Sequence, residues 1–197
     1  WTGRRDVLRQ QGWGFAVLYV GEQDWQAMQA APGDTVPIAV EGARCTTLNL
    51  TAENAARHAV EAETAARSDA FPQNTIIFLD VERVERVRPP LAEYVRTWAR
   101  TMLERGHFVP GLYAHDLSAS ELYAILAEEF VRAGRAERPR LWVARSGGFD
   151  IVRAPQESGY LTASVWQGRF DIRETHDGIT LNIDVNVADT ADPSRGR

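Results

Sequence analysis

The stretch Thr75-Ile-Ile-Phe-Leu-Asp-Val-Glu82 decides the fold prediction for this chain. Its apolar run is typical of a buried strand in a parallel sheet with helices packed against it. Side chains alternate between the two faces of a strand, so Phe78, Asp80 and Glu82 share one face. The two carboxylates then stand at the end of the strand with Cα atoms roughly 6.5–7 Å apart.

Two interpretations of Asp80 and Glu82 follow from these residues alone. Acidic side chains at the point where a buried strand emerges favour acid/base chemistry over a role in solubility. The alternative is that both carboxylates meet solvent or arginine at an ordinary strand end.

Composition narrows the class of protein. The 197 residues are enough for one domain with a substantial core. The net charge of −5 gives no reason to expect nucleic-acid binding. The single cysteine, Cys45, excludes an intramolecular disulfide and a multi-cysteine zinc site. The histidines show no i, i+4 pair, so no histidine-based metal site is expected, and no cofactor is implied.

No apolar run is long enough for a transmembrane helix, and no signal peptide is visible. The chain begins at Trp1 without a methionine, which predicts a mature or trimmed fragment of something longer.

Strand-like and helix-like segments alternate along the chain, which favours a parallel sheet. With right-handed crossovers this gives either an open doubly wound sheet or a (β/α) barrel. No Gly-x-Gly-x-x-Gly or P-loop pattern follows a strand, and the long loops follow strands, as in a barrel whose site lies at the strands' carboxyl ends. The expected strands are 13–20, 36–40, 75–82, 108–114, 141–145, 163–167 and 180–187, and the expected helices are 24–31, 52–67, 89–106 and 118–130.

We therefore predict an α/β chain that folds as a (β/α)8 TIM-type barrel. Residues 1–187 are expected to form this one domain, and residues 188–197 are expected to form a flexible C-terminal tail.

The last predicted strand, Thr180-Leu-Asn-Ile-Asp-Val-Asn-Val187, alternates apolar with polar residues. Its polar face carries Asn182, Asp184 and Asn186. In a barrel this face points inward or toward the mouth, where Asp184 would join Asp80 and Glu82. The alternative is an exposed edge strand with a solvated face.

Further polar and aromatic side chains end other strands. Aromatic rings beside carboxylates suit a sugar site, because the apolar faces of sugars stack on rings while their hydroxyls bind polar groups. For each aromatic residue taken singly, core packing remains the alternative. The candidate binding residues are Tyr19, Glu41, Tyr113, His115, Arg145, Trp166, Gln167 and Asn186.

The chain carries several short motifs, each of them once, in a characteristic order along the sequence. They are Gly-Phe-Ala-Val-Leu-Tyr-Val at 14–20, Phe-Leu-Asp-Val-Glu at 78–82, Pro-Gly-Leu-Tyr-Ala at 110–114, Leu-Trp-Val-Ala-Arg at 141–145, Val-Trp-Gln at 165–167 and Asn-Ile-Asp-Val-Asn at 182–186. In this order the chain resembles the family 25 glycoside hydrolases, the lysozyme-type muramidases. It is more closely similar to the related bacterial glycoside-hydrolase-like domains of unknown function.

The resemblance implies a barrel that acts on cell-wall glycan, with secretion or a cell-envelope location. Carried over by position, Glu82 is the general acid, Asp80 orients or stabilises the reacting group, and Asp184 completes the acidic cluster. Such acid catalysis needs one protonated and one charged carboxyl group. We expect an ionised Asp80, kept charged by Arg145, to raise the pKa of Glu82.

Two departures from the family pattern stand out. The family's first strand with its Gly-x-Asp motif has no counterpart, so the resemblance allows for an incomplete barrel. The strand near 163–167 ends in Trp-Gln-Gly instead of Trp-Gln-Tyr.

Three functions remain open on the sequence. The first is a hydrolase of cell-wall glycan, with peptidoglycan as substrate. The second is a related barrel in a larger protein that binds glycan or a cell-wall partner without cleaving it. The third is a barrel with unrelated chemistry or an interaction domain.

Overall fold

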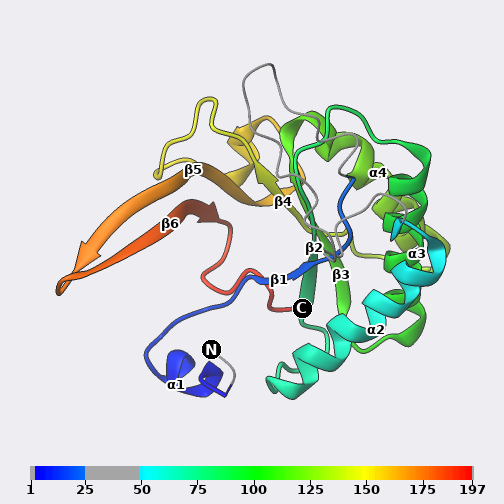
Figure 1. Cartoon of the computed structure of the whole chain (residues 1–197), viewed down its shortest axis with the longest axis horizontal. Coiled ribbons are helices and arrows are strands. Elements are labelled where there is room, and N and C mark those ends of the chain that lie inside the picture. The colour runs from blue at the N-terminus through cyan, green and yellow to red at the C-terminus, as the bar shows by residue number, and fades with distance from the viewer. Residues whose placement is uncertain (1–2, 25–48, 197) are drawn as a thin grey trace, which may run out of the picture.

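The computed structural model describes residues 3–24 and 49–196, and its centre is a curled six-stranded sheet (Figure 1). The strands lie side by side in chain order, and the first five are parallel. The sixth is antiparallel to the fifth, and this pair projects from the body as a long hairpin in Figure 1. The strands are β1 (Val17–Val20), β2 (Ile76–Val81), β3 (Val109–His115), β4 (Leu141–Ala144), β5 (Ala163–His176) and β6 (Ile179–Ala188).

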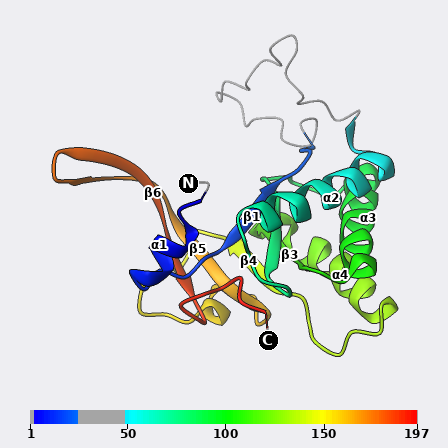
Figure 2. The ribbon, with the colours of Figure 1, turned by 90° about the horizontal axis from the view of Figure 1, so that it is seen from below.

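Three long helices cover one face of the parallel strands, as Figure 2 shows. The core lies between them and the apolar side chains of β2, namely Ile77, Leu79 and Val81. Because these three alternate with Phe78 and Asp80, the carboxylate of Asp80 stands on the face that these helices leave uncovered. The helices are α1 (Arg5–Gln10), α2 (Ala52–Ser68), α3 (Pro89–Arg105) and α4 (Asp116–Arg132), and a short 3-10 helix spans Pro155–Ser158.

Helix α3 shows how closely the local signals determine an element. Pro89 and Pro90 occupy its first turn, where a missing backbone N–H costs nothing. Gly106 ends it with a left-handed φ of 67°. The stripe predicted to be apolar, which includes Tyr94 and Trp98, is buried against the sheet. The prediction of a helix from Pro89 to about Gly106 is confirmed.

The predicted (β/α)8 barrel is not shown. The described residues form a half-barrel of six strands, and within them the sheet does not close. The expected strand 36–40 and most of the expected helix 24–31 lie outside the described residues.

The last strand differs from the parallel one of a (β/α)8 barrel. Asp177 and Gly178 both have positive φ, 49° and 80°, so the chain makes a two-residue turn there and runs back along β5. An Asp-Gly pair with two positive φ values is the strongest short-range signal for a hairpin. The polar residues of β6 therefore lie on a ribbon and not on a closing barrel strand.

The C-terminal segment, expected to be a flexible tail, makes specific contacts. Ser194 is buried, and its carbonyl oxygen accepts from the amide of Ile76 at 2.7 Å. Its hydroxyl accepts from the amide of Val17 at 2.7 Å, and its amide donates to the carbonyl of Phe15 at 2.9 Å. The segment thus bridges the starts of β1 and β2.

No helix among the described residues has the length and apolarity needed to cross a membrane.

Candidate functional site

A row of side chains crosses the face of the sheet that α2, α3 and α4 leave uncovered. Asp80 on β2 is in register with Tyr113 on β3, which is in register with Trp142 on β4. Residues directly opposite one another on paired strands point to the same face. The rings of Tyr113 and Trp142 meet edge to face at 5.2 Å between centroids, and Phe78 packs on Trp142 at 5.7 Å. Aromatic rings therefore flank the carboxyl group of Asp80.

Asp80 is a buried carboxyl group with one oxygen unpaired. Its side chain is 5% exposed, and Oδ1 has no hydrogen-bond partner within the described residues. Burial raises the pKa of Asp80 to about 7, and the charge of nearby Glu82 adds to this effect. The expectation of an Asp80 kept ionised by Arg145 is therefore wrong, because Asp80 retains its proton up to about neutral pH.

Glu82 follows directly after β2 and is exposed. It lines a cavity of about 250 Å³ at the carboxyl ends of β2, β3 and β4. This position matches the place where loops at strand ends build sites in α/β proteins. The remaining lining residues are Arg83, Tyr113, His115, Ala144 and Phe170.

The side chain of Gln23 holds the backbone between the two carboxylates. Its amide nitrogen donates to the carbonyl oxygen of Asp80 at 2.9 Å, and its amide oxygen accepts from the backbone N–H of Glu82 at 3.0 Å. Gln23 is itself buried. Both bonds fix the spacing of Asp80 and Glu82, a role that the sequence did not signal because Gln23 lies in a loop after β1.

The three predicted acidic residues, Asp80, Glu82 and Asp184, all lie near the hydroxyl of Tyr113. Burial raises the pKa of its hydroxyl, and the charges of Glu82, Asp80 and Asp184 raise it further. All three carboxylates therefore act on one phenol, which stays a protonated hydrogen-bond donor at neutral pH. Asp184 reaches this neighbourhood from the hairpin.

The polar residues of β6 each hold another part of the sheet. Asn186 accepts from the indole N–H of Trp142 at 2.9 Å. Asp184 accepts from the side-chain amide of Gln167 at 2.6 Å. The predicted residues Gln167, Asp184 and Asn186 are thus connected to one another and to Trp142, which the sequence reasoning did not single out.

His115 stands at the junction of β3 and α4. Its Nδ1 lies 2.8 Å from a carboxylate oxygen of Asp116, and it caps α4 by accepting from the amide of Leu117 at 3.4 Å. The ring also lines the cavity beside Glu82. The structure therefore brings His115 and Tyr113 together with the acidic pair.

Other predicted residues are placed elsewhere. Tyr19 is in register with Leu79 on the helix-covered face, and its hydroxyl donates to Glu61 at 3.1 Å. Trp166 is fully buried, and its indole donates to the carbonyl of Arg145 at 2.7 Å. Glu41 lies outside the described residues.

The guanidinium of Arg145 turns away from Asp80. It donates to the carbonyl of Ser158 and lies 3.7 Å from the carboxylate of Asp116. It therefore belongs to the loop after β4 and not to the acidic pair.

Gly168 accounts for the departure from a Trp-Gln-Tyr motif. A Cβ at this position would lie 1.8 Å from the ring of Phe149. Phe149 in turn packs edge to face on Trp166 at 5.0 Å. The space that a larger residue would need is taken by Phe149, so the ring comes from the loop after β4 and not from β5.

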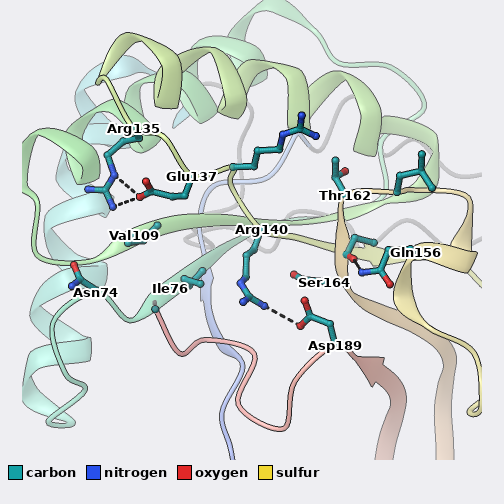
Figure 3. A pocket seen from close by; sticks show the side chains of 14 residues that line it. Asn74, Ile76, Val109, Arg135, Glu137, Arg140, Gln156, Thr162, Ser164 and Asp189 are labelled. Carbon is teal, nitrogen blue, oxygen red and sulfur yellow. Dashed lines mark hydrogen bonds and ion pairs between the residues drawn. The ribbon is translucent and has the colours of Figure 1, made fainter.

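A second, larger cavity of about 640 Å³ lies at the other end of the sheet (Figure 3). It is lined by residues at the starts of strands, among them Ile76, Val109 and Ser164. Figure 3 shows two ion pairs at its sides, Arg135 with Glu137 and Arg140 with Asp189, the latter at 2.9 Å. Because Asp80, Glu82 and Asp184 do not line it, this cavity is separate from the site.

Among residues 3–24 and 49–196, no group of three or more histidine, cysteine or acidic side chains has an arrangement that could hold a metal ion.

Comparison with known proteins gives a family and a fold. A model of the family described as "Rv2525c-like, glycoside hydrolase-like domain" matches residues 3–188. An uncharacterised protein of B. stearothermophilus has a similar structure, with a TM-score of 0.50 and 20% identity over 93% of this chain and 91% of that one. At this identity the likeness concerns the fold.

The spore cortex lytic enzyme SleM of Clostridium perfringens matches with a TM-score of 0.45 and 15% identity. The match covers 71% of this chain and 46% of that one. No curated protein matches the chain significantly.

Proposed function

The chain belongs to the Rv2525c-like, glycoside hydrolase-like domain family, and from this premise we propose that it hydrolyses a cell-wall glycan. Peptidoglycan is the proposed substrate and the reaction is the muramidase type seen in family 25 glycoside hydrolases. The proposed location is outside the cytoplasmic membrane, secreted or in the cell envelope, because the substrate lies there.

One observation carries the proposal: a buried carboxyl group that keeps its proton to about pH 7 stands beside an exposed carboxylate at the mouth of a cavity. Acid catalysis of glycoside cleavage needs one protonated and one charged carboxyl group. The pair supplies this combination near neutral pH.

The proposed roles follow from exposure. Glu82 lines the cavity and is the member that delivers the proton to the glycosidic oxygen as its bond to the anomeric carbon breaks. In the proposed mechanism Glu82 receives this proton from Asp80, which is left with the negative charge. Tyr113 lines the same cavity, and its hydroxyl is available as a hydrogen-bond donor there.

The experiment uses purified peptidoglycan and measures new reducing ends. We expect release by the wild type and a loss of at least about a hundredfold in Glu82→Gln, since an amide cannot donate the proton in the same way. The matched control is Glu85→Gln, an exposed glutamate three positions further along that does not line the cavity. Full activity in Glu82→Gln, or equal loss in the control, would contradict the assignment.

A second candidate, binding of glycan without cleavage, is favoured by β1. The residue in register with Asp80 on this neighbouring strand is Val20, an apolar side chain that is 66% exposed. The family's first-strand aspartate thus has no counterpart on the strand beside Asp80. Peptidoglycan that binds to the wild type without any release of reducing ends would support this second function.

A further inference from the structure

Strand β5 is distorted where it leaves the body of the sheet. Its pairing with β6 shifts register twice, between Gln167 and Arg169 and again between Arg169 and Ile172. Within the second shift Asp171 has a φ of 56°, a left-handed conformation that is uncommon for residues other than glycine. Bulges of this kind are frequent beside functional sites, where they re-aim a side chain.

Two side chains of β6 hold this bulge in place. The carboxylate of Asp184 accepts from the backbone N–H of Asp171 at 2.9 Å and from the side-chain amide of Gln167 at 2.6 Å. The amide of Asn182 donates to the carboxylate of Asp171 at 3.0 Å. Asp184 therefore accepts from Gln167 with one carboxylate oxygen and from Asp171 with the other, and so bridges the bulge.

The bulge brings Phe170 to the cavity that Glu82 lines. Phe170 lies within the second register shift and is 38% exposed. It forms part of the cavity wall with Glu82, Arg83 and Tyr113. A large aromatic side chain that stays partly exposed beside polar groups is suited to hold a ligand with one apolar face.

We propose that Phe170 is the stacking platform for a pyranose ring next to Glu82, and that Asp184 is the positioning residue that sets this platform by clamping the bulge. The inference rests on the proposed function, since it assumes that the cavity receives a glycan. It assigns Asp184 a structural task at the site in place of a direct part in the acid chemistry.

The chemistry of the cavity fits a sugar. One face of a pyranose ring is made of C–H groups and can lie on Phe170, while its hydroxyls point sideways to hydrogen-bonding groups. Arg83, Tyr113 and His115 supply donors on the same cavity wall. The volume of about 250 Å³ lies below the roughly 300–1,000 Å³ of pockets for drug-sized ligands and suits a single ring of a chain that continues into solvent.

The test measures binding of a β-1,4-linked N-acetylglucosamine tetramer by titration calorimetry in the Glu82→Gln background, where cleavage does not interfere. We expect Phe170→Ala to weaken binding about tenfold or more and Phe170→Trp to bind at least as well as the parent. Asp184→Ala should weaken binding to a similar degree. The double variant Phe170→Ala, Asp184→Ala should bind no worse than Phe170→Ala alone, because Asp184 acts through Phe170.

Leu181→Ala is the matched control. Leu181 is an exposed apolar residue of the same hairpin, 48% exposed, and it does not line the cavity. Its removal should leave the dissociation constant unchanged. Circular dichroism of each variant shows whether Asp184→Ala keeps the fold, and Asp184→Asn, which retains an oxygen for the Asp171 amide, provides a milder second variant.

The outcomes separate this inference from the proposed function. Phe170-dependent binding without release of reducing ends from peptidoglycan would support the stacking platform and contradict hydrolysis. Equal binding by Phe170→Ala and its parent, or no binding of the tetramer at millimolar concentration by any variant, would overturn the platform. Additive losses in the double variant would overturn the positioning role of Asp184.

Discussion

The environment of Asp80 differs strongly from that of a carboxylate in water. Burial first and the charge of Glu82 second raise its pKa in the folded protein to about 7, well above the ordinary value of an aspartic acid. Between these two values the folded state binds more protons than the unfolded state. The free energy of unfolding must therefore fall as pH rises from about 4 to 7.

Replacing Asp80 by asparagine should remove this pH dependence. The amide is neutral at every pH, so Asp80→Asn should be more stable than the wild type at pH 8, by about 4 kcal/mol as an upper limit from the pKa difference. At pH 4 the two proteins should differ little. Denaturant unfolding at pH 4, 6 and 8 measures this, and a difference that does not change with pH would contradict the buried, protonated carboxyl.

Residue positions could be predicted from the sequence where one face of a strand is clearly apolar. This holds for β2, whose alternation correctly placed Asp80 opposite the helix-packed Ile77, Leu79 and Val81. It fails for Tyr19, because β1 is apolar on both faces and the pattern does not say which one meets α2. Gln23 was missed because its role depends on a loop conformation that has no sequence pattern.

Elements were predicted well when local signals agreed, as in α3, and poorly when a signal was read in the wrong context. The Asp177-Gly178 pair is visible in the sequence, yet the segment after it was assigned to a barrel strand. The antiparallel pairing of β5 and β6 shows that the local signal was the better guide.

Gly168 lies at the first register shift of β5, and its missing side chain leaves room for the ring of Phe149. Gly168→Ala should destabilise the fold by roughly 1–3 kcal/mol, because the added Cβ meets Phe149, whose ring must shift. The shift would also disturb the contact between Phe149 and Trp166. Denaturant unfolding measures the loss.

The matched control is Gly147→Ala in the loop after β4. There the nearest atom to an added Cβ is 3.7 Å away and belongs to the flexible side chain of Arg145, so the change should be neutral or slightly stabilising. An unchanged stability in Gly168→Ala would contradict the packing described for this end of the hairpin.

At the scale of the whole molecule, the C-terminal segment completes the hydrogen bonding of β1 and β2. Ser194→Ala should lower the free energy of unfolding by about 1–3 kcal/mol, because the amide of Val17 loses the only partner described for it. Ser120→Ala on the exposed face of α4 should change it by less than about 0.5 kcal/mol. Thermal unfolding of both variants gives the comparison, and equal melting temperatures would contradict a structural role for Ser194.

This bridge has a consequence for the order of folding during synthesis. Val17 and Ser194 are separated by 177 positions, so the ribosome adds most of the described residues before the hydroxyl that accepts from the Val17 amide exists. The strands β2 to β4 and their helices can pair as they emerge, since their contacts are between neighbours in the chain. The starts of β1 and β2 therefore stay unbridged in the nascent protein until translation has passed Ser194.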